Sequence, residues 1–368
     1  MFLRWVGAAG RGPGFVMCVG LPDSAGVVPP TLGRAGGEVH GARGARPKSD
    51  ETPASWSTTL ALMSRKITVS LPDASLRKYL QPHADVTILE WDLTGEPPLP
   101  RIDIVVPPYM GGPQVLQGLE RVDTALVQSQ SIGYDGVAEF LPSGRVFANA
   151  SGVHETSTAE LALALILASQ RELPRLIQHQ QEGSWDARPT ASLADRRVLI
   201  VGYGGVGKAI EDRLLPFETS VTRVASTVRM DERGQVHGIA ELQALLPVHD
   251  IVVVGVPLSD STRHLIDDAF LAAMPDGALV VNVARGPVAD TDALVRHTAS
   301  GRIRAALDVT DPEPLPQDHP LWLAPGVIIS PHVGGASSAM RPRMGRLLQR
   351  QIELMLAGEP PVNVVLNG

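Results

Sequence analysis

The sequence predicts a doubly wound α/β fold with two parallel sheets. From about residue 63, short apolar runs alternate with helix-like stretches, the order in which a parallel sheet and its crossover helices are built. The alternation pauses at the loop "GSWDARPTASLADR" (183–196) and then begins again. Two α/β series in one chain indicate two domains.

The first series opens with the strand-like "KITVSLP" (66–72), followed by the helix-like "ASLRKYLQPH" (74–83). Further strands are expected at "DVTILEW", "IDIVVPP", "TALVQSQ" and "RVFANAS". Ser157 and Glu160 then match a capping box, so we expect a long helix to begin at Ser157.

The second series opens with "RVLIVG" (197–202), a continuous apolar run of the kind that is buried on both faces of a parallel sheet. The remaining strands are expected at "SVTRVAS", "DIVVVGVP", "ALVVNVA", "IRAALDVT" and "GVIISPH". Helix-like stretches separate them, which favours a doubly wound sheet.

Residues 1–62 have a different composition from the rest of the chain. They are crowded with Gly, Ala, Pro and Arg and show no sustained period of 2 or 3.6, so they are not expected to bury a core. The sequence "GRGP" (10–13) interrupts the apolar stretch that a signal peptide would need. We expect a disordered extension or a misassigned start, with the folded protein beginning at Met63.

Composition excludes several classes of protein. The net charge of −7 argues against general binding of nucleic acid, and no apolar run reaches the roughly 20 residues of a membrane helix. Cys18 is the only cysteine, which excludes an internal disulfide framework and a Cys-based zinc site. We therefore expect a cytoplasmic protein with a small-molecule partner and neither a nucleic-acid nor a membrane partner.

A glycine-rich loop follows the first strand of the second series. Gly202, Gly204 and Gly207 form the pattern GxGxxG directly between "RVLIV" and the helix-like "KAIEDRLLPF". The pattern alone is weak, but in this position it predicts a turn that carries a pyrophosphate at a helix N-terminus. We interpret it as a dinucleotide site rather than a purely structural turn.

The end of the second strand indicates which dinucleotide is bound. Enzymes that use NAD normally place an acidic residue about 20 residues beyond the glycines, whereas this chain has Ala225. Ser226, Thr227 and Arg229 follow and could donate hydrogen bonds to a 2′-phosphate. The cofactor is predicted to be NAD(P), with NADP(H) slightly favoured over NAD(H), because a neutral strand end also tolerates NAD.

Three charged side chains follow successive strands of the second series, namely Arg285, Glu313 and His332. Singly they read as a surface cation, a turn residue and a core histidine. Together they suit the reduction of a 2-oxo acid, which needs a cation for the carboxylate and carbonyl, a proton donor, and a carboxylate that keeps the donor protonated. No further ligand lies at metal-site spacing around His332, so no metal is expected.

At these residues the chain resembles the D-isomer-specific 2-hydroxyacid dehydrogenases, a family that includes phosphoglycerate and glyoxylate/hydroxypyruvate dehydrogenases. The resemblance runs from about Met63 to the C-terminus and is densest in "VGYGGVGKAI", "VPLSDSTRHLID", "MPDGALVVNVARGPVADTDAL", "AALDVTDPEPLP" and "SPHVGGAS". It implies two Rossmann-like or flavodoxin-like α/β domains with the active site in the cleft between them. Residues 63–158 plus 335–368 would form the substrate domain and 159–334 the dinucleotide-binding domain.

The resemblance also implies roles for individual residues. Arg285, Glu313 and His332 would be catalytic, with His332 the acid in reduction and the base in oxidation. Tyr109, Met110 and Gly111 would bind the substrate, with backbone N–H groups on its carboxylate. The cofactor-binding positions implied beside the three glycines, Ser226, Thr227 and Arg229 are Gly205, Val206, Pro257, Thr262, Ala284, Asp308 and Gly334. A homodimer is also implied.

Two alternatives share this scaffold. A nucleotide-sensing protein that resembles the transcriptional corepressors would retain the same three charged residues and use the cofactor to control assembly. A formate dehydrogenase would carry Gln in place of Glu313, so it is disfavoured. The favoured function is hydride transfer between nicotinamide and a small D-2-hydroxy or 2-oxo acid, of the glyoxylate or hydroxypyruvate type.

Overall fold

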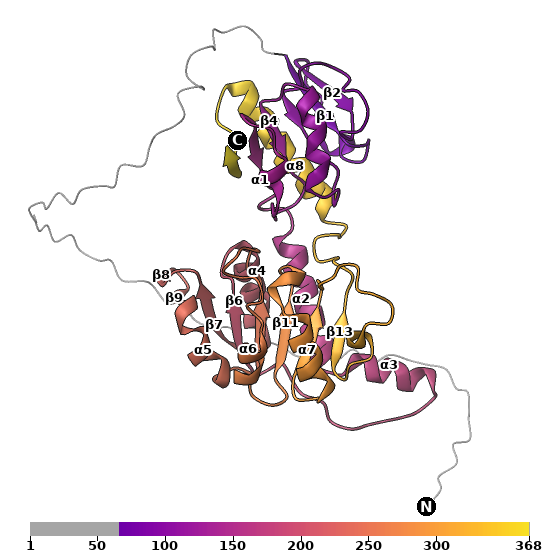
Figure 1. Cartoon of the computed structure of the whole chain (residues 1–368), viewed down its shortest axis with the longest axis vertical. Helices are drawn as coiled ribbons and strands as arrows, with labels where there is room; N and C mark the ends of the chain where they lie inside the picture. The colour runs from indigo at the N-terminus through magenta and orange to yellow at the C-terminus, as the bar shows by residue number, and fades with distance from the viewer. Residues whose placement is uncertain (1–65, 368) are drawn as a thin grey trace, which may run out of the picture. The chain divides into compact units, whose positions relative to one another are not determined.

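The computed structural model describes residues 66–367 (Figure 1). The expectations for residues 1–62 and for a start at Met63 lie outside this part of the chain. The α-helices are α1 (Val137–Phe140), α2 (Glu155–Gln170), α3 (Leu173–Gln181), α4 (Gly205–Leu214), α5 (Leu242–Leu245), α6 (Asp268–Ala273), α7 (Thr291–Ala299) and α8 (Met340–Ala357). The 3₁₀ helices are η2 (Arg77–Tyr79), η3 (Pro113–Arg121), η4 (Leu215–Phe217), η5 (Ile239–Glu241), η6 (Leu246–Val248), η7 (Gly286–Val288) and η8 (Pro320–Trp322).

The first sheet has six strands in the order β14-β5-β4-β3-β1-β2. Its pairs are parallel except that the last strand of the chain, β14, runs antiparallel to β5. Its strands are β1 (Ile67–Leu71), β2 (Val86–Glu90), β3 (Ile104–Val105), β4 (Leu126–Gln128), β5 (Val146–Ala148) and β14 (Val364–Asn367). Met344 and Leu348 of α8 pack on the face of this sheet that carries Ile67 and Val69, so the C-terminal segment completes the first α/β unit.

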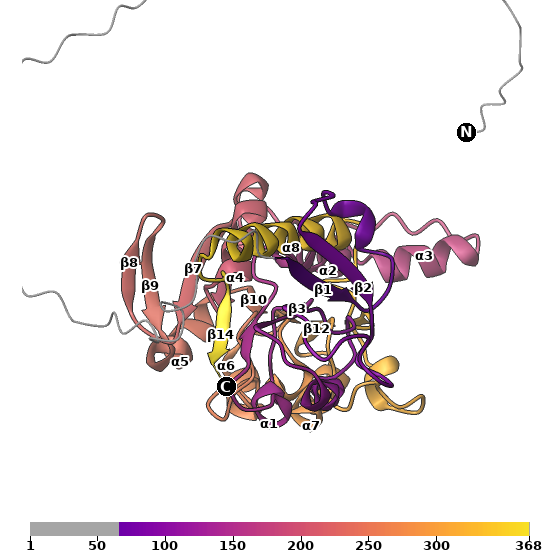
Figure 2. The same cartoon turned by 90° about the horizontal axis from the view of Figure 1, so that it is seen from above.

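The second sheet has eight strands in the order β13-β12-β11-β10-β6-β7-β9-β8. All its pairs are parallel except β8 with β9. Its strands are β6 (Arg197–Val201), β7 (Ser220–Ala225), β8 (Arg229–Asp231), β9 (Gly234–Gly238), β10 (Ile251–Val254), β11 (Leu279–Asn282), β12 (Arg304–Leu307) and β13 (Val327–Ile329). Figure 2 shows the β8–β9 hairpin at the edge of this sheet, beyond β7.

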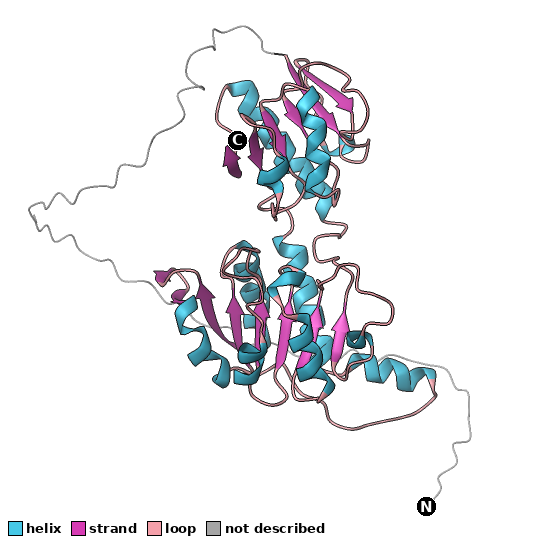
Figure 3. Ribbon diagram, in the orientation of Figure 1, coloured by secondary structure: helices cyan, strands magenta, loops and turns pink. Residues whose placement is uncertain are grey.

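The continuous apolar strands of the second sheet divide their side chains between two cores. In β6, Leu199 belongs to the core that contains Phe270 of α6, whereas Ile200 belongs to the core that contains Ile210 of α4. Successive side chains of a strand point to opposite faces, so a strand covered by helices on both faces must be apolar throughout. Figure 3 shows helices on either side of these strands. The predicted α/β fold with two mostly parallel sheets is confirmed.

Two local predictions are wrong. The stretch 74–83 holds only the short 3₁₀ helix η2, because the backbone is already extended at Leu80, two residues before Pro82. The capping box at Ser157 and Glu160 is also wrong, since α2 already begins at Glu155 and its carboxylate accepts a hydrogen bond from the Gly152 N–H at 2.7 Å.

None of the helices within residues 66–367 is both long and apolar enough to cross a membrane.

Candidate active site

The strand order of the second sheet brings the predicted site residues to one edge. The strands from β13 to β7 all run parallel, so the loops that follow them leave from the same edge of the sheet. The chain goes from β6 to β7 on one side and then to β10 on the other side of β6. Ligands of such sheets bind beyond the carboxyl ends of the strands at the point of reversal, which is where the loop after β6 lies.

Two glycines of this loop are required by the backbone, and the third borders open space. Gly202 has a φ of +103°, and a Cβ there would lie 2.6 Å from the backbone carbonyl carbon of Gly255. A Cβ at Gly207 would overlap the carbonyl oxygen of Gly202. Both positions therefore require glycine for folding. A Cβ at Gly204 would meet nothing within 4 Å, so this glycine faces open space at the start of α4, where the first N–H groups of a helix lack intrahelical partners.

The other positions around this loop are also at the carboxyl edge. Gly205 and Val206 form the first turn of α4, and Gly205 lies against the side chain of Glu155. Beyond β10, the Thr262 hydroxyl donates to the carbonyl oxygen of Pro257 at 2.7 Å. This bond shapes the turn that follows Pro257.

The expected 2′-phosphate ligands lie at the end of β7. Ser226 and Thr227 are exposed in the connection to β8. Arg229 begins β8, and its Nη2 donates to the Tyr203 carbonyl oxygen of the glycine loop at 2.9 Å. No sequence pattern predicted the β8–β9 hairpin, so this link between the arginine and the loop was not expected.

Arg285 follows β11 and is held by two hydrogen bonds. Its Nε donates to Asp135 Oδ2 at 2.8 Å, and its Nη1 donates to the Ala284 carbonyl oxygen at 2.7 Å. The guanidinium fills the space beside Gly133, where a Cβ would overlap Nη2. Within residues 66–367 no group accepts a hydrogen bond from Nη2, so this amino group can receive a ligand carboxylate.

His332 and Glu313 are brought into direct contact. His332 Nδ1 lies 2.6 Å from Glu313 Oε1, and the two side chains are 27% and 40% exposed. No atom of the described part of the chain hydrogen-bonds to His332 Nε2. If Nδ1 carries the proton that Glu313 accepts, the ring presents Nε2 to whatever binds beside it.

Asp308, at the end of β12, organises the loop that carries His332. Its Oδ1 accepts hydrogen bonds from the Ser330 hydroxyl (2.7 Å) and the Val333 N–H (2.9 Å), and its Oδ2 accepts from the Gly334 N–H at 2.9 Å. The His332 N–H donates to the Asp308 carbonyl oxygen at 2.7 Å. His332 has a φ of +52°, a conformation that such a network can hold.

Tyr109, Met110 and Gly111 follow β3 of the first sheet. Tyr109 stacks on His154 with ring centroids 5.7 Å apart. Burial raises the pKa of the Tyr109 phenol, the Asp308 carboxylate adds to this effect, and the Arg285 guanidinium opposes it. Met110, by contrast, is 54% exposed.

Two residues of this region were not predicted from the sequence. Asp135, which orients Arg285, lies 150 positions away from it in the sequence, and only the looser match in "SIGYDGV" could have drawn attention to it. His154 was also missed; its Nε2 lies 2.6 Å from the Gln130 carbonyl oxygen and its Nδ1 3.2 Å from that of Gly335.

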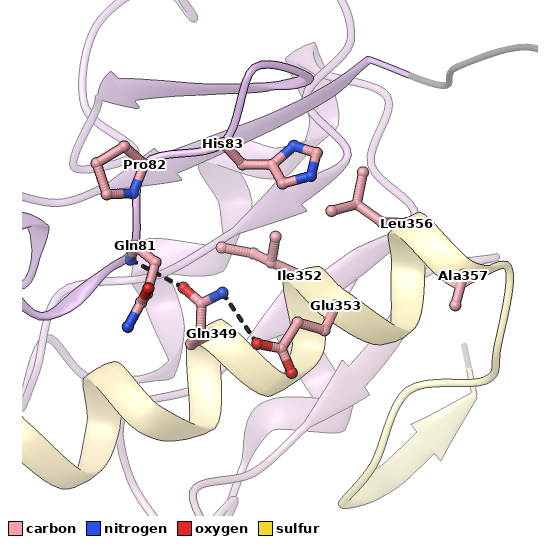
Figure 4. A pocket seen from close by; sticks show the side chains of 8 residues that line it. All are labelled: Gln81, Pro82, His83, Gln349, Ile352, Glu353, Leu356 and Ala357. Carbon is pink, nitrogen blue, oxygen red and sulfur yellow. Dashed lines mark hydrogen bonds between the residues drawn. The ribbon is translucent and has the colours of Figure 1, made fainter.

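A surface pocket elsewhere contains none of the predicted residues. It lies between the turn at 81–83 and α8 (Figure 4) and is lined by Gln81, Pro82, His83, Gln349, Ile352, Glu353, Leu356 and Ala357. Gln349 of α8 links the two sides by accepting from the Gln81 N–H at 3.0 Å, and within α8 it donates to Glu353 at 3.1 Å.

Comparisons with known proteins agree with this architecture. Residues 163–334 match the family model described as "D-isomer specific 2-hydroxyacid dehydrogenase, NAD binding domain". The chain is 33% identical to the mouse glyoxylate reductase/hydroxypyruvate reductase over 324 residues, which cover 81% of this chain and 96% of the mouse protein. It is 33% identical over 252 residues to a glyoxylate reductase of Thermofilum pendens, covering 65% and 74%.

A solved structure is similar over most of the chain. The D-isomer specific 2-hydroxyacid dehydrogenase of Xanthobacter autotrophicus Py2, in complex with NADPH and MES, superposes with a TM-score of 0.69 at 28% identity, over 82% of this chain and 98% of that one.

The fold and the site define the class: a doubly wound α/β enzyme with a glycine-loop nucleotide site. The chain belongs to the D-isomer-specific 2-hydroxyacid dehydrogenase family. It is an NAD(P)-dependent oxidoreductase that acts on the CH–OH group of its donors.

Proposed function

We propose that the protein reduces small 2-oxo acids of the glyoxylate or hydroxypyruvate type to D-2-hydroxy acids, with NADP(H) preferred over NAD(H). The observation that carries this proposal is the contact of 2.6 Å between His332 and Glu313, at the same sheet edge as Arg285 and the glycine loop. Relatives named glyoxylate reductase, at 33% identity, support the choice of acid.

The glycine loop fits a dinucleotide. Gly204 leaves open space at the N-terminus of α4, and a helix N-terminus favours the negative charge of a pyrophosphate. Gly205 and Val206 would hold the phosphates with their backbone, while the segments around Pro257, Ala284 and Gly334 would face the rest of the cofactor. The bound nicotinamide supplies the hydride in reduction and accepts it in oxidation.

Arg285 binds the acid. Its Nε is engaged by Asp135 and its Nη2 is not engaged by the described chain, so the guanidinium is oriented before the acid arrives. A planar guanidinium pairs with a carboxylate and polarises an adjacent carbonyl oxygen. Backbone N–H groups at 109–111 hold the far side of the carboxylate, and Tyr109 and Met110 limit the size of the substrate.

His332 moves the proton. Glu313 accepts the hydrogen bond of Nδ1, which orients the ring and leaves Nε2 for the substrate. Nε2 then donates its proton to the oxygen of the forming alcohol in reduction and removes it in oxidation. Reduction of a 2-oxo acid adds a hydride to the carbonyl carbon and a proton to the carbonyl oxygen. Arg285 polarises this carbonyl and His332 supplies the proton, so the pair suits a 2-oxo acid.

The cofactor preference rests on the end of β7. Ala225 brings no negative charge to the adenosine ribose, and Ser226, Thr227 and Arg229 offer hydrogen bonds to a 2′-phosphate. A homodimer in the cytoplasm is proposed with this function, from the family resemblance and the single cysteine.

Initial-rate assays of the full chain test the proposal. Glyoxylate, hydroxypyruvate, pyruvate and longer 2-oxo acids are each offered with NADPH and NADH. We expect turnover of glyoxylate and hydroxypyruvate, and a higher kcat/KM with NADPH than with NADH. His332→Gln should lower kcat by about 10² to 10⁴ with unchanged NADPH binding. Tight nucleotide binding without turnover of any acid would instead support the corepressor-like alternative.

A further inference from the structure

A buried carboxylate beside the glycine loop has no part in the chemistry described above. Glu211 lies on α4, and its side chain is fully buried. Its Oε1 accepts from Arg223 Nε at 2.8 Å, and its Oε2 accepts from the Tyr203 hydroxyl and from Arg233 Nη1, the latter at 3.3 Å. The carboxylate thus joins the glycine loop, β7 and the turn of the β8–β9 hairpin.

The cluster is charged but balanced. Arg223 and Arg233 face Glu211, and Arg233 also pairs with Asp212 at 2.6 Å. Burial alone would raise the pKa of Glu211, but hydrogen bonds from Arg223 and Tyr203 outweigh it and the pKa is lowered. Burial, with the Glu211 hydrogen bond, raises the pKa of Tyr203 to about 12. Glu211 is therefore an ionised acceptor, which is retained in a buried site only when it is paired.

The hairpin depends on these side chains for its position. A two-stranded ribbon is marginally stable alone, and β9 pairs with β7 through only Val224 with His237 and Ala225 with Gly238. At the turn of the hairpin, Arg233 contacts Glu211 and donates to the Lys208 carbonyl oxygen at 3.3 Å. The cluster therefore fastens the turn to α4.

The same cluster fixes the other end of the hairpin. Arg229 donates to the carbonyl oxygen of Tyr203, whose hydroxyl is bound by Glu211 and whose ring lies under the Arg223 guanidinium at 5.6 Å. Tyr203 thus accepts the Arg229 hydrogen bond with its backbone and is held in place by Glu211 through its side chain.

We infer that Glu211 is a positioning residue for cofactor discrimination: it holds Tyr203 and the β8–β9 hairpin so that Arg229 stands ready for the 2′-phosphate of NADP(H). This inference rests on the proposed preference for NADP(H). It assigns a role in discrimination to a carboxylate that is fully buried and therefore acts only through the residues it holds.

Fluorescence titration of the full chain with NADPH and with NADH tests the inference without requiring turnover. In Glu211→Gln, which keeps the shape but removes the charge, we expect the Kd for NADPH to rise about tenfold and the Kd for NADH to change by less than about twofold. Glu232→Gln is the matched control, because Glu232 is exposed in the same hairpin turn and has no part in the cluster.

The outcomes separate the possibilities. Equal weakening of both nucleotides, or no weakening of either, would overturn the inference, and so would a wild-type protein that binds NADPH no more tightly than NADH. Selective binding with no turnover of any acid would leave the inference standing and refute the proposed reaction.

Two further variants guard against a folding defect in Glu211→Gln. Arg233→Met removes the anchor of the turn at a partly exposed position and should produce the same selective loss of NADPH. In an Arg229→Met background, Glu211→Gln should cause little additional loss, because residues that act through one contact are not additive. An additional tenfold loss there would show that Glu211 does not act through Arg229.

Discussion

Gly133→Ala is a small change that should displace the substrate-binding arginine. The ideal Cβ position at Gly133 lies 2.6 Å from Arg285 Cζ, whereas carbon atoms in contact are about 3.5 to 4.0 Å apart. The terminal Nη2 lies closer still to that position, so the guanidinium would have to retreat by about 2 Å to reach contact distance. Gly133 does not have a positive φ, and the clash involves the far end of a flexible side chain, so the backbone should accept alanine.

The size of the effect follows from that displacement. A retreat of this size would lengthen the bond of 2.8 Å between Arg285 Nε and Asp135, which orients the guanidinium. A misplacement of about 1 Å can reduce a rate about 10²-fold. We therefore expect kcat/KM for glyoxylate to fall at least about 100-fold, while the Kd for NADPH and the Tm change little.

The assay is a double-mutant cycle on initial rates with Gly133→Ala, Arg285→Ala and the combination. Once the guanidinium is absent, an alanine at 133 meets only Asp135 Oδ2 at 3.1 Å, which a small shift of that side chain relieves, so the double variant should be no slower than Arg285→Ala. The reasoning is refuted if Gly133→Ala keeps more than half of the wild-type kcat/KM, or if its full effect persists without Arg285.

Two further predictions concern a hydrogen bond at the site and one far from it. Glu313→Gln should lower kcat about tenfold, since a charge-assisted hydrogen bond contributes about 1.5 kcal/mol at a partly exposed site; Asp318→Asn, exposed in the same loop, is the control, and equal rates for the two variants would contradict the role of Glu313. Asp250→Asn should lower the free energy of unfolding at pH 7 by about 1 to 2 kcal/mol, because hydrogen bonds from Arg197 lower the pKa of Asp250. A carboxyl group with a lowered pKa in the folded state stabilises the fold above its unfolded-state pKa, and this stability is lost as the pH falls below about 4. In urea unfolding, the difference in free energy of unfolding between wild type and Asp250→Asn should therefore shrink below that pH. A difference that does not depend on pH would exclude this cause.

The second sheet was predictable because its sequence signal is local. The central strand β10 is apolar at every position, and β6 and β11 are apolar at all but one. The two cores that share β6 show why: Leu199 and Ile200 are both fully buried, on opposite faces. The same logic fails for the segment 74–83, where apolar residues are spaced as in a helix but only η2 forms. The spacing of apolar residues indicates which of them can be buried on one face. It does not ensure that the backbone continues as an α-helix.

The positions of the three charged residues were predictable for a similar reason. Arg285, Glu313 and His332 each follow an apolar strand, and parallel strands bring their carboxyl ends to one edge. The contact between His332 and Glu313 agrees with that expectation. The partner of Arg285 was not predictable, because Asp135 follows a strand of the other sheet and no spacing links the two residues.

The Glu211 cluster shows a second limit of sequence reasoning. On α4 a glutamate followed by Asp212 and Arg213 has the pattern of a solvated helix surface, and burying a carboxylate is unfavourable unless it is paired. What makes burial of Glu211 possible here is a set of partners 8, 12 and 22 positions away, two of which lie on strands or turns whose pairing no local pattern reveals.

Asp308 illustrates how a family role and a structural role can fall on one residue. The resemblance places it near the nicotinamide, whereas in this chain both carboxylate oxygens accept hydrogen bonds from the loop that carries His332. A Cβ at Gly334 would lie 2.8 Å from Oδ2, so the glycine is needed for the loop to close on the carboxylate. This closure also holds the positive φ of His332 in place. Loss of the Asp308 carboxylate should therefore displace the His332 side chain more than it alters the nucleotide site. The position of His332 is thus determined by Asp308 and Gly334 as much as by the strand that precedes it.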